Sequence, residues 1–142
     1  MLRFALSALL VLVAACDSAA DSDLPDDLAQ DPAALVGTWD LAFVTPSGES
    51  SAPPVRTPAS ALPYTQTYVF GADGQAEVYS SGELSLSGPY EVRRIAITDG
   101  SGRVSVDLYI DGDSQDWVGV SGDRLFFDSR PRDGALEEYH RR

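Results

Sequence analysis

The sequence predicts an all-β protein, a small antiparallel up-and-down β-barrel of about eight strands. Short stretches in which apolar and polar residues alternate predict the strands, and after residue 35 no window keeps the spacing of an amphipathic helix. Gly and Asp residues between these stretches favour tight turns. A chain of 142 residues with 44% hydrophobic residues suits one globular domain.

The first element is a signal segment that ends at the single cysteine, Cys16. Arg3 supplies a positive charge, and residues 4–15 form an uncharged apolar run. As a helix this run would span about 18 Å, too short for a hydrocarbon core of about 30 Å. Residues 13–16, Val-Ala-Ala-Cys, resemble the bacterial lipoprotein signal motif. The resemblance implies cleavage before Cys16 and attachment of a diacylglycerol, with acyl chains such as palmitate, to its sulfur. The alternative is an ordinary signal peptide cut before Cys16.

Residues 16–32 are expected to form a disordered tether between the anchor and the folded domain. Residues 17–31 hold six Asp and no basic residue, with few large apolar side chains to offset the entropy of ordering. The stretch is interpreted either as a solvated spacer or as a sorting signal. The sorting direction stays open, because acidic residues after an acylated Cys favour surface display in some bacterial lineages, whereas Asp17 favours inner-membrane retention in others.

Residues 33–142 contain the predicted barrel domain. Residues 31–35 suit one helical turn, because Asp31 is a good cap and Pro32 fits the first helical position. The clearest alternation runs through 104–110, where four aliphatic residues share one face. The expected strands are 38–45, 64–70, 75–80, 84–87, 90–98, 104–110, 117–120, 124–127 and 135–141.

Joining or splitting the segment 84–98 gives eight or nine strands. Consecutive strands joined by short turns favour an antiparallel meander, and closing the meander removes both exposed edges. Residues 46–63 are the exception, because their five Pro exclude a central strand. They are expected to form a long mobile loop over one mouth of the barrel.

Several short motifs occur in the order found in lipocalins and in small bacterial lipocalin-like lipoproteins. Residues 37–39, Gly-Thr-Trp, resemble the Gly-x-Trp signature that opens the first lipocalin strand, and residues 68–74 resemble a Tyr-x-Phe-x-x-Asp-Gly hairpin. Residues 88–90, 123–127 and 133–141 fit the later strands of the same pattern. The resemblance covers about residues 33–142.

The resemblance implies that Trp39 closes the base of the barrel beneath an Arg from the last strand. Arg141 is the candidate for this Arg, with Arg142 or Arg130 as alternatives. Such a cation–π pair contributes about 0.5–2 kcal/mol, so its role is structural.

The barrel interior decides between two functions. A binding protein would touch its ligand through inward residues, for which the candidates are Phe43, Tyr68, Phe70, Val78 and Leu108. Small inward residues would leave a cavity, whereas large rings would fill it. The chain is short for a lipocalin and lacks the lipocalin disulfide, which favours the filled core.

Other chemistry is excluded or weak. The net charge of −12 disfavours nucleic-acid binding. One Cys and one His exclude metal sites built from several of either. The turn 111–116 resembles the start of a calcium loop, with acids at positions one, three and six (Asp111, Asp113 and Asp116), but the EF-hand pattern fails because Gln115 holds position five and no Glu lies at position twelve. A solvated hairpin turn is therefore expected. Glu137 and Glu138 point to opposite faces of a strand and cannot form a carboxylate pair, and His140 has no partner motif for catalysis.

The sequence therefore predicts a non-enzymatic, monomeric lipoprotein of the bacterial cell envelope without a cofactor. A lipid anchor would hold it to a membrane, with the outer membrane favoured over the inner one. Its barrel would bind a small apolar or amphiphilic ligand. The alternative is a structural or interaction protein that has a filled barrel and works through its surface.

Overall fold

The computed structural model describes residues 32–47, 54–96 and 104–142. These ranges contain nine strands and three short 3-10 helices. The strands are β1 (Gly37–Pro46), β2 (Thr57–Pro58), β3 (Gln66–Phe70), β4 (Gln75–Ser80), β5 (Glu83–Ala96), β6 (Val104–Ile110), β7 (Asp113–Ser121), β8 (Arg124–Asp128) and β9 (Ala135–Arg141). The 3-10 helices are η2 (Pro32–Leu35), η3 (Ala59–Ala61) and η4 (Arg130–Arg132).

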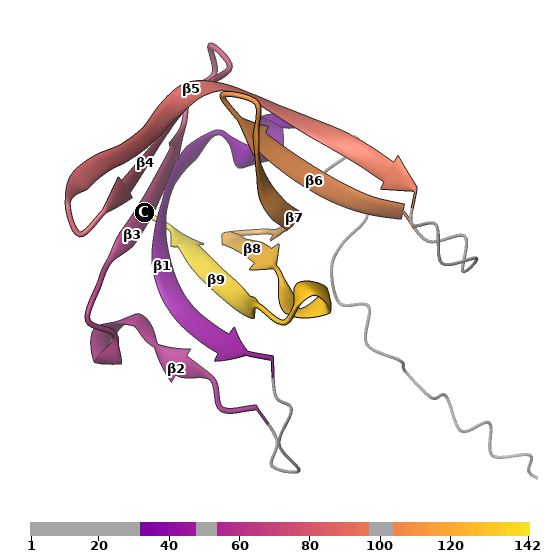
Figure 1. Ribbon diagram of the computed structural model, residues 1–142. Coiled ribbons are helices and arrows are strands. Elements are labelled where there is room, and N and C mark those ends of the chain that lie inside the picture. The colour runs from indigo at the N-terminus through magenta and orange to yellow at the C-terminus, as the bar shows by residue number, and fades with distance from the viewer. Residues whose placement is uncertain (1–31, 48–53, 97–103) are drawn as a thin grey trace, which may run out of the picture.

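The sheet closes on itself between its first and last strands. β1 and β3 to β9 pair in chain order as antiparallel neighbours, and β1 pairs again with β9 (Figure 1). β2 is an additional short strand on the edge of β1. The predicted all-β fold, a small antiparallel barrel of eight strands, is confirmed.

Two strands are longer than the alternation predicts. The segment expected as one or two strands is a single β5, which pairs first with β4 and then, from Tyr90 onward, with β6. β7 begins at Asp113 instead of Trp117. A bulge shifts the register between β6 and β7 before Trp117, and the two strands pair on both sides of it. The predicted turn at 99–102 lies outside the described residues.

The Pro-rich segment is held along β1 over its described part. β2 and η3 lie within residues 54–63, and Phe43 and Val44 of β1 pair with Pro58 and Thr57. Pro58 is tolerated because an edge strand leaves the position of its missing N–H unpaired. The expectation of a free loop is therefore wrong for this stretch. Residues 48–53 lie outside the described part of the chain.

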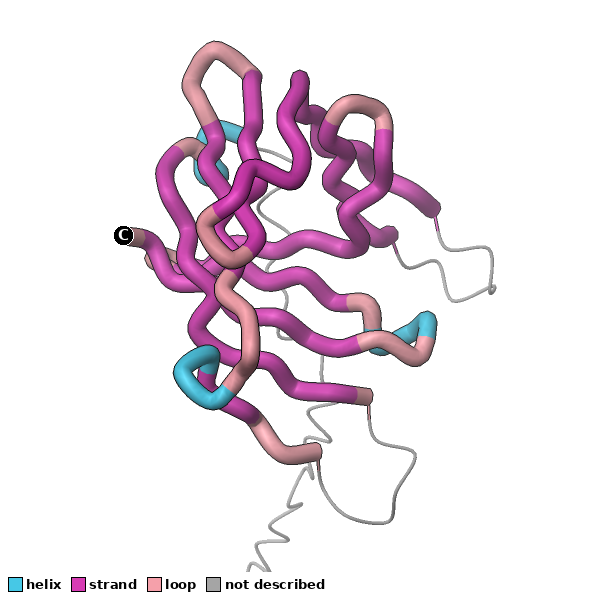
Figure 2. The backbone as a smooth tube through the Cα atoms, turned by 60° about the vertical axis from the view of Figure 1, so that its left-hand side comes forward, coloured by secondary structure: helices cyan, strands magenta, loops and turns pink. Residues whose placement is uncertain are grey.

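The connections gather at two ends of the barrel. One end, the base, carries η2, the β3–β4 turn, the β7–β8 turn and the C-terminus. The other end, the mouth, carries the connection after β1, the β4–β5 turn and η4. The β6–β7 turn lies beside the β3–β4 turn instead, because Asp111 N donates to the Pro89 carbonyl and Tyr90 N to the Gly74 carbonyl. Figure 2 shows the C-terminus and η4 on opposite sides of the molecule. Ser81-Gly82 in the β4–β5 turn and Asp111-Gly112 in the β6–β7 turn have positive φ at both positions, as type I′ hairpins require.

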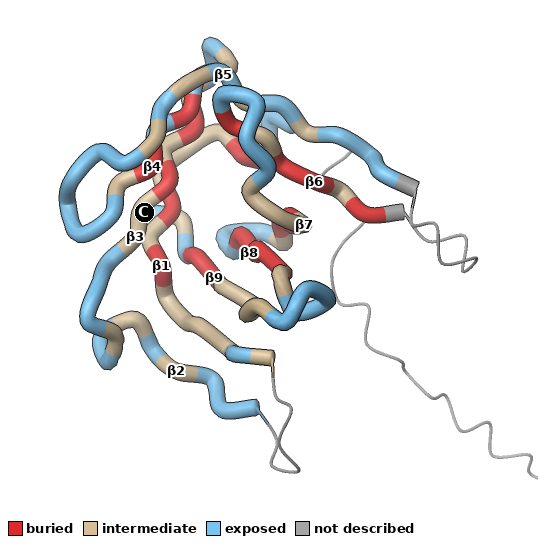
Figure 3. Tube along the Cα trace, in the orientation of Figure 1, coloured by how far each residue is buried: buried red, intermediate tan, exposed pale blue. Residues whose placement is uncertain are grey.

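The inward side chains form one continuous core, which runs along the middle of the strands (Figure 3). Burying such a side chain stabilises the fold by about 1.5–3 kcal/mol. The largest fully buried side chains are Trp39, Tyr139, Phe70, Leu35, Leu108, Ile110 and Leu125.

β1 changes faces at a bulge between Leu41 and Phe43. Trp39 and Leu41 are buried inside, whereas the Phe43 ring lies outside under the Arg56 guanidinium, 3.5 Å from its Cζ. Strict alternation predicted Phe43 on the inner face. That prediction is wrong, because one extra residue at a bulge moves every later side chain to the other face.

Candidate functional site at the mouth of the barrel

The base of the barrel is closed by η2 and Trp39. Leu35, the last residue of η2, is fully buried beneath the strands. Trp39 is fully buried as well, and its indole Nε1 donates a 2.6 Å hydrogen bond to the carbonyl oxygen of Leu35. The indole therefore ties the 3-10 turn to the first strand while its ring adds to the core.

Arg141 covers the Trp39 ring from the last strand. Its Cζ lies 4.0 Å from the ring centroid. Its Nη1 and Nη2 donate hydrogen bonds to the carbonyl oxygens of Val36, at 2.6 Å, and Ala34, at 3.0 Å. The structure thus brings together the two residues that the lipocalin resemblance pairs. The C-terminal end of η2, the residue that follows it and the last strand therefore meet in this one contact.

Gly37 makes the approach of Arg141 possible. Its φ is +140°, a backbone conformation that L side chains rarely adopt. A Cβ built on Gly37 would lie 2.6 Å from Arg141 Nη1, closer than atoms can pack. The Gly of the Gly-x-Trp motif therefore leaves room for the guanidinium that the Trp needs.

Above the base, aromatic rings fill the interior. The Tyr68 ring lies 4.9 Å from Phe127 and 5.2 Å from Tyr139, centroid to centroid, and Phe127 and Tyr139 are 5.5 Å apart. Phe70 stacks on Tyr68 at 5.9 Å. Rings at these distances are in direct contact, so no ligand fits between them.

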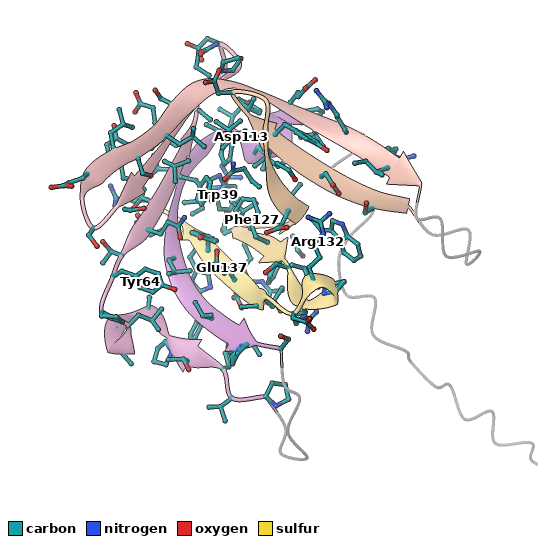
Figure 4. All side chains as sticks on the ribbon, in the orientation of Figure 1. Trp39, Tyr64, Asp113, Phe127, Arg132 and Glu137 are labelled. Atoms are coloured by element: carbon teal, nitrogen blue, oxygen red, sulfur yellow. The ribbon has the colours of Figure 1, made fainter. Side chains whose placement is uncertain are left out.

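The carboxylate of Glu137 lies beyond Phe127 on the side away from Trp39, towards the mouth (Figure 4). Tyr139 Oη donates a 2.7 Å hydrogen bond to Glu137 Oε2, from the same face of β9. The side chains of Tyr68 and Tyr139 meet edge to face, and Gln66 Nε2 donates a long 3.4 Å hydrogen bond to Tyr68 Oη. Tyr64, just before β3, is partly exposed. We call Glu137, Tyr139, Tyr68 and Tyr64 the mouth cluster.

The negative charge of Glu137 acts on the hydroxyls of all three tyrosines of the mouth cluster. Burial raises the pKa of Tyr64, Tyr68 and Tyr139 above the ordinary value of 10, and the negative charge of Glu137 raises each further. All three hydroxyls therefore stay protonated at neutral pH. They offer oxygen acceptors and O–H donors around one carboxylate.

A second carboxylate, Asp116, lies beside the cluster at the β7 bulge. Its φ of +84° marks the irregular point where β7 re-registers on β6. Its charge also raises the pKa of Tyr68, after burial and Glu137. Arg132 of η4 donates a 3.0 Å hydrogen bond from Nη1 to Asp116 Oδ1. The arginine at the rim is thus paired with Asp116.

The outer face carries a different cluster, in which Glu138 holds two basic side chains. Arg56 Nη2 donates a 2.6 Å hydrogen bond to Glu138 Oε2, and His140 Nε2 lies 2.9 Å from Oε1. Burial opposes the ionisation of Glu138, but the bonds to His140 and Arg56 lower its pKa overall. Glu137 and Glu138 therefore face opposite sides of β9, as the strand period predicts, and His140 is exposed.

The described residues also line an open hollow of about 580 Å³ on the outside of β1 and β3. Thr38, Thr67 and Tyr79 border it, and Arg142 makes two hydrogen bonds to Asp40 along its wall. Arg142 is therefore engaged outside the barrel and does not cover Trp39.

The acidic turn after β6 forms a hairpin, with Asp111 and Gly112 at its tip. Asp116, the last acid of the calcium-like sequence, bonds Arg132 instead of turning back towards Asp111. Within the described ranges, no group of three His, Cys, Asp or Glu side chains is placed to hold a metal ion.

The predicted ligand-binding residues separate into three environments. Phe70, Val78 and Leu108 belong to the packed core, and Phe43 lies outside. Tyr68 alone among them reaches the mouth cluster. Sequence reasoning missed Glu137, Tyr64 and Asp116, although the spacing of Glu137 and Tyr139 on one strand face was a usable signal. Cys16 lies outside the described residues.

The closed eight-stranded barrel, plugged at one end, is consistent with a lipocalin-like binding fold. No family model, curated protein or solved structure matches this chain. In the described part of the chain, no helix has the length and apolar character to cross a membrane.

Proposed function

We propose that this protein is a lipid-anchored lipocalin-like lipoprotein that binds one end of a small amphiphilic molecule at the mouth of its barrel. One observation carries the binding role: the barrel has a sealed base and, at the other end, tyrosine hydroxyls around a carboxylate. A purely structural barrel gains nothing from a charged group inside its open end, because burying a charge is costly.

The mouth suits part of an amphiphile better than a whole apolar molecule. The contacts between Tyr68, Phe127 and Tyr139 occupy the space an acyl chain would need. Val55 and Tyr64 are exposed on the connection between β1 and β3, and Leu84 is exposed at the start of β5. A polar headgroup would bond the mouth cluster, and an apolar tail would lie against these side chains.

The anchor part of the proposal rests on the Val-Ala-Ala-Cys motif at residues 13–16 after an apolar run. A bilayer surface concentrates amphiphiles next to the domain, and two or three acyl chains hold it firmly. A location in the bacterial cell envelope follows, with the outer membrane favoured over the inner one.

The anchor is tested by intact-mass analysis of the protein extracted from bacterial membranes, with Cys16→Ser as the variant. We expect an acylated chain that begins at Cys16 and a Cys16→Ser chain released from the membrane. A membrane-bound Cys16→Ser chain without acyl mass would contradict the anchor.

The binding role is tested by native mass spectrometry of the unacylated chain and by titration with a fluorescent fatty-acid-like probe. We expect a saturable signal with one site per chain. Absence of both a retained ligand and a saturable signal would refute it.

A second candidate function is a surface interaction role, which the filled interior favours. In that case the outer hollow beside Asp40 and Tyr79 would carry the contacts. Binding of the probe that survives Glu137→Gln but is lost in Tyr79→Ala would favour this second candidate.

A further inference from the structure

We infer that the mouth cluster selects ligands that carry a positively charged nitrogen, such as an alkylammonium group. This inference rests on the proposed binding role of the mouth and names the chemistry that the site recognises. Its basis is a carboxylate, Glu137, that meets tyrosine side chains and no cation.

Glu137 is a partly buried carboxylate without a basic partner, whereas the strand carboxylates Glu77, Glu83 and Asp113, which also bond no basic side chain, are exposed. Asp40, Asp128 and Glu138 each bond an arginine. Within the described residues, Glu137 bonds only the Tyr139 hydroxyl. Asp107 also lacks an ion pair, but its side chain is only 2% exposed and cannot meet a ligand. Glu137 is half-buried, so a ligand can reach it. Its negative charge has no basic side chain beside it among the described residues.

Arg132, at the rim of the mouth, is engaged by another carboxylate. Arg132 donates to Asp116, at 3.0 Å. This pair neutralises the second carboxylate of the mouth and leaves Glu137 as the uncompensated charge. A ligand cation would therefore pair with Glu137 without displacing an arginine of the described chain.

The tyrosines complete a set of acceptors that matches an ammonium group. An alkylammonium ion has three N–H donors and no acceptor. Among the described residues, only Oε2 of Glu137 accepts a hydrogen bond, so Oε1 is available, and Tyr68 Oη receives a long bond from Gln66 and interacts with the Tyr139 hydroxyl. Tyr64 offers a third oxygen and a partly exposed ring. Aromatic faces attract cations by their quadrupole.

The charge of the whole chain supports the same selection. The net charge of −12 attracts cations to the surface and repels carboxylates and phosphates. An anionic headgroup would meet Glu137 directly and be excluded. A neutral hydroxyl could bond the tyrosines but would gain nothing from the carboxylate charge.

The test is calorimetric titration of the full-length Cys16→Ser chain with three probes of equal tail length: octylamine, octanol and octanoate. We expect octylamine to bind about tenfold more tightly than octanol, which corresponds to about 1.4 kcal/mol, and octanoate not to bind. Raising the salt concentration should weaken octylamine binding and leave octanol unchanged.

Two variants locate the effect. Glu137→Gln keeps an acceptor for Tyr139 and removes the charge, so octylamine should fall to the affinity of octanol. Glu83→Gln, an exposed position at the β4–β5 turn, makes the same charge change and should alter neither affinity. Tyr64→Leu, at a partly exposed position outside the strands, should weaken octylamine about threefold and covers the case of a poorly folded Glu137 variant.

The outcomes separate the two levels of the proposal. Octanol binding as tightly as octylamine, or Glu137→Gln leaving octylamine unaffected, would overturn the ammonium preference and leave ligand binding at the mouth intact. Failure of all three probes to bind would overturn the proposed function and this inference with it.

Discussion

The two ends of the barrel differ in whether their polar side chains find partners within the chain. At the base, the indole of Trp39 and the guanidinium of Arg141 donate hydrogen bonds to carbonyl oxygens of residues 34–36, with Trp39 fully buried and Arg141 partly buried. At the mouth, the Tyr139 hydroxyl ends on Glu137, whose charge has no cation beside it. The base is therefore saturated from within the chain, whereas the mouth keeps capacity for an external partner. Stability should depend on the first end and binding on the second.

The largest expected effect is at the base. Trp39→Ala removes a fully buried indole, its hydrogen bond to Leu35 and the ring beneath Arg141. We expect the free energy of unfolding to fall by about 3–5 kcal/mol, as for other large-to-small core changes. Urea denaturation followed by fluorescence of Trp117 measures the loss. A loss below about 1 kcal/mol would mean that the base is not the stabilising end.

The next effect tests whether Gly37 is needed for the Arg141 contact. Gly37→Ala forces an L side chain to φ +140° and places a Cβ against Nη1 of Arg141. We expect a loss of about 1–3 kcal/mol, typical of strained backbone positions. Gly82→Ala is the matched control, because its φ is also positive but no atom lies within 4 Å of the added Cβ. Equal losses in both variants would show that the Arg141 contact adds nothing.

Alkaline pH probes the buried tyrosines that join the core to the mouth. Burial and Glu137 raise the pKa of Tyr68 and Tyr139 in the folded state above the ordinary value of 10. The unfolded chain therefore loses these protons first, so stability is constant below about pH 10 and falls above it. The expected slope is about 1.4 kcal/mol per pH unit for each tyrosine. Tyr68→Phe should reduce the slope, and a stability that stays level to pH 12 would contradict this account.

The smallest effect is expected at the mouth itself. Glu137→Gln keeps the size of the side chain and an acceptor for Tyr139, so the free energy of unfolding should change by less than about 0.5 kcal/mol. Thermal denaturation of this variant beside Trp39→Ala makes the comparison directly. A loss as large as that of the base variant would show that Glu137 is part of the stabilising core and not of a binding site.

The sequence predicts the strands better than the faces of their residues. Alternation and Gly or Asp turns are local signals, so most strands, including 75–80 and 135–141, could be located from residues alone. A bulge adds one residue without any local signature, which is why Phe43 was placed on the wrong face. The pairing of Trp39 with Arg141 was accessible only through the ordered lipocalin-like motifs.

The mouth cluster is harder to predict, because its members come from distant parts of the chain. Tyr64 precedes β3, whereas Glu137 and Tyr139 lie on β9. The barrel closure brings these segments together, and Asp116 joins them through a bulge with a left-handed residue. The expectation that Glu137 and Glu138 face apart was correct, yet it was used only to exclude a carboxylate pair. Their separation instead leaves Glu137 unpaired inside.

The central claim, that the base stabilises and the mouth binds, is tested most directly by a ¹H–¹⁵N NMR titration of the full-length Cys16→Ser chain with octylamine. The account predicts saturable shifts at Tyr64, Asp116, Glu137 and Tyr139, with no change at Leu35, Gly37 or the indole N–H of Trp39. Shifts centred on the base, or on the outer hollow beside Asp40 and Tyr79, would contradict it.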